Sequence, residues 1–321
     1  MSGTAATDPA DVVLTDAHWR VVVAPARGML IREALDVASG AVTLWRQEPA
    51  DGSPFSCELP PGGPASAQTF AGLFEGGWFP LFPAAGFVGE LDGIPTLYHG
   101  ELARLPWEVA DRGPSWVEVR VRTVRAPFAV TRRVVLDGGE LRIETEAVND
   151  GDVPASFTYG EHPCFPHATF AGGRLELEAR TAWIPRPAFD PERATLALGE
   201  RFSWPHAPRR DGVPCDLSRL PEAPDRRHDH ACVELASSRV RLTAPRHGRA
   251  LELDVDLAAT PYALLWQQLD RDGVFAVEPM SAPGRGVADA VAAGAVRRLG
   301  PGERFRTALA LRWVDLGPAA S

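Results

Sequence analysis

The sequence contains no lysine, so all 33 of its basic residues are arginine. Without an ε-amine the protein cannot form a lysine Schiff base, anchor pyridoxal phosphate or use a P-loop lysine. Asparagine occurs only at Asn149, whereas alanine, arginine, glycine and proline are abundant. This bias is typical of a GC-rich coding sequence, and we read no thermal adaptation into it.

Cysteine is scarce as well. The four cysteines, Cys57, Cys164, Cys215 and Cys232, lie far apart, and no two of them have C-x-x-C spacing. This pattern argues against a structural zinc site and against a disulfide scaffold, and it favours a reducing compartment.

Long apolar runs and a positive net charge are also missing. No stretch approaches the roughly 18 apolar residues of a membrane-spanning helix, and the residues from Met1 to Asp11 lack the basic-then-apolar pattern of a signal peptide. The net charge is −9, which disfavours a nucleic-acid partner. The sequence therefore predicts a soluble, cytoplasmic protein with no membrane partner and no nucleic-acid partner.

What is present is a series of short β-branched and aromatic runs separated by glycine and proline, a pattern typical of consecutive strands. The clearest alternation of apolar and charged residues covers residues 116–149, where Asp137-Gly138-Gly139-Glu140 predicts a hairpin turn. Nothing alternates strand with helix, so a doubly wound fold is disfavoured. We expect an all-β protein built as one large antiparallel β-sandwich.

The domain organisation is expected to be simple. Residues 1–15 are predicted to form a loose N-terminal tail, and residues 16–316 a single β-sandwich domain. Residues 49–67 are rich in proline, glycine and serine and predict a loop, whereas residues 74–83 predict an irregular, partly buried wall. The only helix-like composition covers residues 287–298.

Several residues are suited to acid–base chemistry. His162 stands at the end of an apolar run beside prolines, which cannot donate to a strand ladder, so we expect the strand to end abruptly there. Glu278 follows another apolar run, and a buried carboxylate is costly unless it has a partner or a task. A raised pKa of Glu278 would suit a general base that works near neutral pH. His99 and Asp229 lie in two further segments that combine histidine with charged residues.

These residues lie in motifs that resemble the aldose 1-epimerase (galactose mutarotase-like) superfamily over nearly the whole chain. In chain order the motifs are Tyr98-His99-Gly100 with Ala103-Arg104 and Pro106-Trp107-Glu108-Val109, His162-Pro163 with Phe165, Asp229-His230, Val277-Glu278-Pro279, and Leu299-Gly300-Pro301-Gly302-Glu303. The segment from Gly76 to Gly86 is similar to the less studied branch known as aldose 1-epimerase-like. The resemblance implies a β-supersandwich in which residues 16–316 form a sugar-binding catalytic domain.

The resemblance also implies a reaction, the interconversion of the α and β anomers of a hexopyranose or modified sugar. By position, Glu278 would take the proton of the anomeric hydroxyl and His162 would protonate the ring oxygen. The ring would open to the aldehyde and reclose as the other anomer. The residue types fit this chemistry independently, because both pKa values can be moved toward neutrality and the reaction needs neither a cofactor nor a metal.

Substrate-binding residues follow from the same resemblance. His99 and Asp229 would hydrogen-bond sugar hydroxyls. An apolar face for stacking would come from one of three tryptophans, between which the sequence does not choose: Trp78, Trp107 and Trp266.

Two departures from the family pattern bear on the substrate. The segment from Phe79 to Gly86 has no arginine, whereas well-studied galactose mutarotases carry one there that contacts sugar hydroxyls. Glu161 stands directly before His162, where the branch often carries a second histidine. We therefore hypothesise a less polar substrate, such as a deoxysugar or a modified glycoside.

Two side-chain roles have alternatives. His228 and His230 are two residues apart and would share one face of a strand, so a metal site there is an alternative to a solvated loop with a sugar-binding Asp229. Arg104 would either recognise a sugar phosphate, as in the hexose-6-phosphate epimerase branch, or form a salt bridge with a glutamate.

Two rival functions use the same fold. One is a catalytically silent carbohydrate-binding protein. The other is an isomerase or cyclase recruited into specialised metabolism, with the same acid–base pair acting on a different ring. In every case we expect a small-molecule sugar partner, no cofactor, no metal, and a monomer or homodimer.

Overall fold

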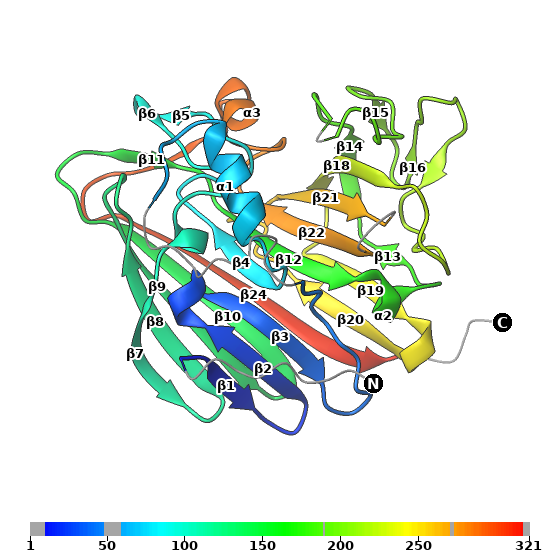
Figure 1. Ribbon diagram of the computed structural model, residues 1–321, viewed down its shortest axis with the longest axis horizontal. Coiled ribbons are helices and arrows are strands. Elements are labelled where there is room, and N and C mark those ends of the chain that lie inside the picture. Colours follow the sequence, from blue (N-terminus) through cyan, green and yellow to red (C-terminus); the bar gives the residue numbers. More distant parts are fainter. Residues whose placement is uncertain (1–9, 48–58, 189, 270–272, 317–321) are drawn as a thin grey trace.

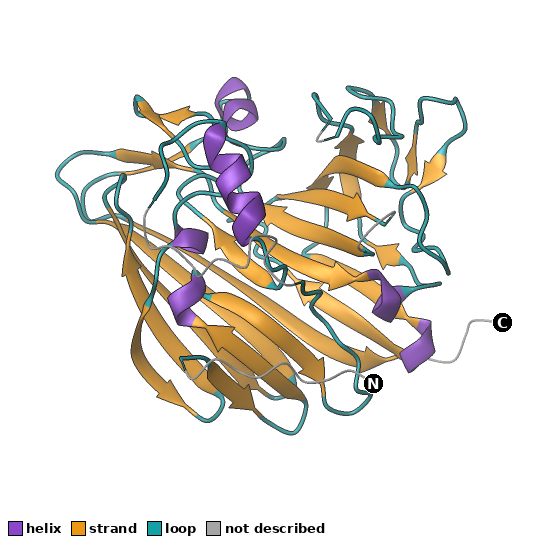
Figure 2. Ribbon diagram, viewed as in Figure 1, coloured by secondary structure: helices purple, strands orange, loops and turns teal. Residues whose placement is uncertain are grey.

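The computed structural model describes residues 10–47, 59–188, 190–269 and 273–316. Two large β-sheets lie against each other, and the few helices lie at their edges and on one outer face (Figures 1 and 2). The pairs of neighbouring strands in both sheets are antiparallel. The predicted all-β antiparallel sandwich is therefore confirmed.

The first sheet has ten strands and carries the residues of interest. Its order is β1 (Val12–Thr15), β2 (Trp19–Ala24), β3 (Leu30–Asp36), β4 (Trp78–Leu81), β12 (Gly160–Pro166), β22 (Val274–Met280), β21 (Tyr262–Gln268), β18 (His228–Leu235), β14 (Ala179–Trp183) and β15 (Arg201–Phe202).

The second sheet has eight strands. Its order is β13 (Leu175–Glu176), β19 (Arg239–Ala244), β20 (Arg249–Asp254), β24 (Arg304–Asp315), β10 (Glu140–Asn149), β9 (Phe128–Asp137), β8 (Trp116–Arg122) and β7 (Glu108–Gly113).

Short elements complete the described chain. Three two-stranded sheets pair β11 (Ala155–Phe157) with β23 (Arg297–Leu299), β16 (His206–Ala207) with β17 (Cys215–Asp216), and β5 (Glu90–Leu91) with β6 (Ile94–Pro95). The helices are α1 (Ala65–Leu73), α2 (His167–Phe170), α3 (Val287–Ala292), and the 3-10 turns η1 (Pro25–Arg27), η2 (Leu102–Arg104) and η3 (Pro245–His247).

The main core fills the space between the two sheets. Because side chains alternate along a strand, each strand of the ten-stranded sheet sends every second residue into this core. On β18, Ala231 and Val233 point inward, and on β22, Phe275 and Val277 do so. A smaller apolar cluster covers the outer face of the ten-stranded sheet, where Phe70 of α1 packs on strand residues.

Some local predictions differ from the structure. Val12–Thr15 form an edge strand with β2 rather than a loose tail, because Val12 and Leu14 alternate into the core. Residues 65–67, predicted as loop, begin α1, and the helix at the C-terminal end is shorter than residues 287–298. Within the predicted irregular wall, Trp78–Leu81 form β4. The first part of the predicted loop, residues 49–58, lies outside the described residues.

The strand that holds His162 does not end there. β12 continues through Pro163 and ends at Pro166. Its pairing with β22 is interrupted between the pairs Gly160–Met280 and Cys164–Ala276. Proline thus removes ladder hydrogen bonds without ending the strand, because its fixed φ is compatible with extended backbone.

Candidate active site

A row of side chains crosses the outer face of the ten-stranded sheet. Strand register aligns Phe79 with His162, and Glu278 with Leu264 and Cys232. The paired residues on either side of His162 and Glu278 place these two residues opposite each other on β12 and β22. The row, from β4 to β18, is Phe79, His162, Glu278, Leu264 and Cys232.

His162 and Glu278 form a close, buried pair. His162 Nε2 lies 3.6 Å from Glu278 Oε1, and the residues are 5 % and 2 % exposed. The other carboxylate oxygen, Oε2, is buried and has no hydrogen-bond partner among the described residues. Burial raises the pKa of Glu278 well above its usual value and lowers the pKa of His162 to about 3. Both shifts disfavour the charged forms, as low-dielectric surroundings require.

Aromatic rings enclose the imidazole of His162. Phe79 stacks on it with ring centroids 4.8 Å apart, while Phe74, at the C-terminal end of α1, and Trp266 on β21 approach edge-on at 6.1 and 5.7 Å. Phe74 and Trp266 also contact each other. These rings account for the strong desolvation of the pair and give the site an apolar wall.

His99 reaches the same site from a tight turn. Its ring lies 5.3 Å from that of His162 and 3.9 Å from that of Tyr98. His99 has a φ of 62°, and the following Gly100 also has positive φ, so the chain reverses sharply and directs the imidazole inward. Its Nδ1 is buried and has no hydrogen-bond partner in the described ranges, and burial lowers the pKa of His99 well below the usual value.

Asp229 points away from the site, because successive side chains of β18 point to opposite faces of the sheet. Its carboxylate accepts hydrogen bonds from Thr195 N (2.8 Å), Thr195 Oγ1 (2.7 Å) and Leu196 N (2.9 Å), so it holds the loop before β15. The adjacent His230 points to the outer face instead. Burial lowers the pKa of His230 to about 3, and the charges of Arg285, His228 and His162 act in the same direction. The predicted role of Asp229 in sugar binding stays a prediction, although its oxygens are already engaged here.

The three candidate tryptophans also divide between the site face of the sheet and the core. Trp266 lies beside His162. Trp78 points into the core between the sheets, where its Nε1 donates to Glu161 Oε2 at 2.6 Å. Trp107 is also in that core and donates to the Leu102 carbonyl. Trp266 alone of these three therefore has a ring at the acid–base pair.

Glu161 belongs to the core and not to the site. Arg132 of β9 donates to Glu161 Oε1 at 2.5 Å and to Oε2 at 2.8 Å, and both side chains are fully buried. Tyr159 and Trp78 also donate to this carboxylate. The departure from the family pattern at Glu161 consequently concerns how the two sheets are joined, which corrects our inference that it bears on the substrate.

Arg104 secures α1 above the site. Its guanidinium donates to the Ser66 carbonyl at 2.7 Å and to Thr69 Oγ1 at 3.3 Å, and it lies over the Phe70 ring. The expected salt bridge with a glutamate is absent from the described residues, because Glu101 accepts backbone N–H groups instead. Burial and the charge of Arg125 lower the pKa of Arg104 to about 10. Its predicted substrate contact is untested.

Within the described part of the chain, no group of three or more histidine, cysteine, aspartate or glutamate side chains is arranged to hold a metal ion. His228 and His230 share the outer face of β18, as predicted for neighbours two residues apart. A third ligand of these types does not join them among the described residues.

Sequence reasoning missed several residues of the site. Tyr98 was noted only as part of a motif, yet burial raises its pKa and the nearby Glu278 raises it further. Phe74 and Phe79 were assigned to a wall without a role. His230 was considered only as a metal ligand, and testing both phases of the strand would have assigned it to the site face. Arg285 gave no signal because it stands in a glycine- and proline-rich turn.

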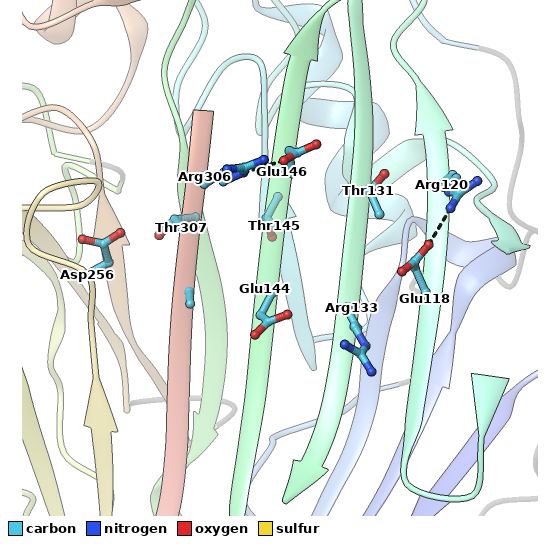
Figure 3. Close-up of a pocket in the computed structure, with 11 residues that line it drawn as sticks. Glu118, Arg120, Thr131, Arg133, Glu144, Thr145, Glu146, Asp256, Arg306 and Thr307 are labelled. Carbon is cyan, nitrogen blue, oxygen red and sulfur yellow. Dashed lines mark hydrogen bonds and ion pairs between the residues drawn. The ribbon is translucent and has the colours of Figure 1, made fainter. Parts of the chain in front are cut away.

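A depression lies on the solvent face of the eight-stranded sheet, away from the His162–Glu278 pair (Figure 3). It has a volume of about 640 Å³, but its acids and arginines neutralise each other, as in Arg306–Glu146 (2.5 Å) and Arg120–Glu118 (2.7 Å). No histidine is among its described lining residues. Exposed ion pairs of this kind are ordinary sheet-surface pairs, and they do not by themselves indicate a site.

No family model and no curated protein matches the chain. Solved structures do match. The Slr1438 protein from Synechocystis has a TM-score of 0.71 at 19 % identity, covering 98 % of this chain and 100 % of its own. A candidate aldose 1-epimerase from Escherichia coli K12 has a TM-score of 0.67 at 17 % identity, and the match covers 95 % of this chain and 99 % of that one. A galactose mutarotase related enzyme from Lactobacillus acidophilus has a TM-score of 0.66 at 16 % identity, and the match covers 95 % of this chain and 97 % of that one.

These likenesses define the fold. The chain has the galactose mutarotase-like β-sandwich over nearly its whole length, and the resemblance inferred from the motifs is confirmed at this level. None of the described helices is long and apolar enough to cross a membrane. A cytoplasmic location and a monomeric or dimeric state stay predictions.

Proposed function

We propose that the protein is an aldose 1-epimerase, an isomerase that interconverts the α and β anomers of a hexopyranose or a modified sugar. The observation that carries the proposal is the buried His162–Glu278 pair, with Nε2 and Oε1 3.6 Å apart in an aromatic-walled site. The names of the Escherichia coli and Lactobacillus acidophilus proteins of the same fold agree with this activity. Function belongs to the site, so the proposal depends on the pair and not on the fold.

Mutarotation needs one group that gives a proton while another takes one. In the assignment implied by the resemblance, the Glu278 carboxylate removes the proton from the anomeric hydroxyl and the His162 imidazolium protonates the ring oxygen. The C1–O5 bond breaks and the aldehyde forms. After rotation about C1–C2 the carbonyl is attacked from its other face, and the two groups exchange roles as the ring recloses.

A single proton shared by the pair is enough for this cycle. The imidazolium–carboxylate form and the imidazole–carboxylic acid form contain the same number of protons. In the ligand-free site, burial raises the pKa of Glu278 and lowers that of His162, which favours the neutral form. From that form Glu278 would give the first proton and His162 would take one, so the cycle can run in either direction from either form.

Binding groups surround the pair on the outer face of the sheet. In this proposal His99, whose buried Nδ1 is unpaired among the described residues, would hydrogen-bond a sugar hydroxyl, and Trp266 would cover a ring face. We propose that His230 takes the hydroxyl-binding role that the sequence assigned to Asp229. The hypothesis of a less polar substrate, such as a deoxysugar, stays a prediction.

The test is anomer exchange followed by saturation-transfer NMR on glucose, galactose and several 6-deoxyhexoses. We expect the wild type to accelerate exchange and both His162→Ala and Glu278→Gln to reduce it by about 10²–10⁴-fold, the usual contribution of a general acid or base. Glu234→Gln is the matched control and should retain the wild-type rate, because Glu234 lies on the same face of β18 as His230.

Two results would change the proposal. Strong acceleration with plain galactose at a low Michaelis constant would reject the deoxysugar hypothesis while leaving the epimerase in place. A folded wild type that accelerates exchange of no aldose would favour a silent sugar-binding protein or a recruited isomerase. Binding of the same sugars without exchange would then identify the silent protein.

A further inference from the structure

Arg285 is a buried arginine whose guanidinium forms no hydrogen bond with a described residue and lies against the Phe87 ring. It lies between β22 and α3 and is 6 % exposed. Its backbone is fixed at both ends, since its N–H donates to Asp289 Oδ2 at 2.7 Å and its carbonyl accepts from Phe87 N at 2.8 Å. Its guanidinium forms no hydrogen bond or ion pair with a described residue, and its Nε is buried and unsatisfied.

The head group belongs to the wall of the candidate active site. Its Cζ lies 4.4 Å from the centroid of the Phe87 ring, which contacts Tyr98 at 5.1 Å, and Tyr98 contacts His99 at 3.9 Å. The electrostatics agree with this position. The charge of Arg285 lowers the pKa of His230, and the pKa of Tyr98 is affected by both Glu278 and Arg285.

Other buried arginines of this chain show what a structural role looks like. Arg132, fully buried, makes a bidentate pair with Glu161. Arg104 donates twice to α1. A guanidinium removed from water needs such partners, because desolvation of an unpaired charge is costly. The Nε atoms of all three arginines lack a partner among the described residues, so Arg285 differs from the other two only at its terminal nitrogens. The nearby Asp289 favours the charge of the guanidinium, but its Oδ2 accepts from the backbone N–H of Arg285.

We propose that Arg285 binds an anionic substituent, a carboxylate or a phosphate, carried by the sugar whose anomeric centre is held at His162 and Glu278. The inference rests on the proposed function for the placement of that ring. The planar guanidinium fork matches two oxygens of either anion, which gives both affinity and orientation. Because the acid–base pair acts at C1 and the ring oxygen, the anionic group is attached to a different carbon. The substrate class is therefore a sugar acid or a sugar phosphate, in place of the less polar sugar hypothesised from the sequence.

The test uses glycosides that cannot open their rings, so that binding is measured without catalysis. The probes are the neutral methyl glycopyranoside, the methyl glycuronide and the methyl glycoside 6-phosphate, each in the gluco and galacto series, together with inorganic phosphate alone. Dissociation constants are measured by calorimetry for wild type, Arg285→Gln and Arg285→Lys. Arg201→Gln, an exposed arginine of β15, is the matched control.

We expect the wild type and Arg201→Gln to bind one charged glycoside at least 10-fold more tightly than its neutral counterpart. In Arg285→Gln the ratio of the two constants should fall to about one, and Arg285→Lys should retain part of it. The charged probe that binds more tightly identifies the anion as carboxylate or phosphate. Equal or undetectable binding of charged and neutral probes by the wild type, or a preference that survives in Arg285→Gln, would overturn the proposal.

Failure of this inference is separable from failure of the epimerase proposal. Anomer exchange on free neutral sugars with no charge preference in binding would leave the epimerase in place and remove the role of Arg285. An Arg285-dependent preference without exchange on the matching free sugar acid or phosphate would do the reverse. Thermal denaturation of each variant shows that a lost preference does not reflect unfolding.

Discussion

The imidazole of His162 stacks on the phenyl ring of Phe79, its partner across β12 and β4, with ring centroids 4.8 Å apart and planes inclined by 19°. The stack holds one face of the imidazole while Nε2 is directed to Glu278. Phe79 also contributes to the apolar surroundings that desolvate His162. One apolar side chain thereby controls both the orientation and the pKa of the candidate acid–base group.

Replacing Phe79 by alanine should admit water to this site. The pKa of His162, now about 3 because of burial, should rise toward the usual value near 6.5. Anomer exchange should slow by about 10-fold or more, because a loosened imidazole loses its productive orientation. Histidine NMR titration and the pH dependence of exchange measure the two effects. Phe79→Leu, which keeps an apolar contact, is the control, and an unchanged titration in Phe79→Ala would contradict the role.

Replacing Glu278 by glutamine should stabilise the protein while strongly reducing its activity. The folded pKa of Glu278 is raised by burial, so the stability it contributes is complete below its unfolded pKa of about 4.5 and declines as the pH rises toward the folded value. Glutamine does not titrate. We therefore expect the melting temperature of Glu278→Gln to exceed that of the wild type at pH 8 by about 2 °C or more, with the difference shrinking toward pH 4.

Calorimetric melts between pH 4 and pH 8 test this expectation. Glu234→Gln, half-buried on the same sheet face, should show no such growth of the difference with pH. A wild type that is more stable than Glu278→Gln at pH 8 would mean that the carboxylate has a stabilising partner in the folded protein.

Replacing Asp229 by asparagine should reduce stability more than activity. The carboxylate accepts three hydrogen bonds from Thr195 and Leu196, and an amide can accept through only one of its two polar atoms. Loss of acceptors for buried donors should cost about 1–3 kcal/mol of unfolding free energy. Urea denaturation measures this loss.

Steady-state kinetics of the same variant decides between the two roles of Asp229. We expect its Michaelis constant to stay within about twofold of the wild-type value, whereas His230→Gln should raise it. A rise of tenfold in Asp229→Asn with little loss of stability would restore the sugar-binding role that the sequence assigned to the carboxylate.

The buried pair of Glu161 and Arg132 should be a large stability determinant. Glu161→Gln leaves a guanidinium uncompensated between the sheets, which should cost about 3–5 kcal/mol in urea denaturation. Glu146→Gln, which breaks an exposed pair with Arg306, should cost about 0–1 kcal/mol. Equal effects of the two substitutions would show that the buried network has no special weight. Substrate preference should be the same in both variants, because both side chains lie outside the site.

Much of the architecture is present in local sequence pattern. The alternation over residues 116–149 predicts three strands, and β8, β9 and β10 pair in that order. Such pairing follows from short turns and period-two burial, both of which are local properties. The segment that became α1 carries no comparable signal, because its helix is short and is stabilised by contacts with Arg104 and the aromatic cluster rather than by its own periodicity.

Residue chemistry and motif order single out His162, Glu278 and His99 as candidates from the sequence alone, because histidines beside glycine or proline and a carboxylate after an apolar run stand out without coordinates. Tertiary structure decided which neighbours join them. Pairing of β12 with β22 places His162 against Glu278, and the phase of β18 sends His230 to the site face and Asp229 into the core. A shift of one residue along a strand exchanges its two faces, so strand phase and long-range register, which local sequence does not specify, determine the composition of the site.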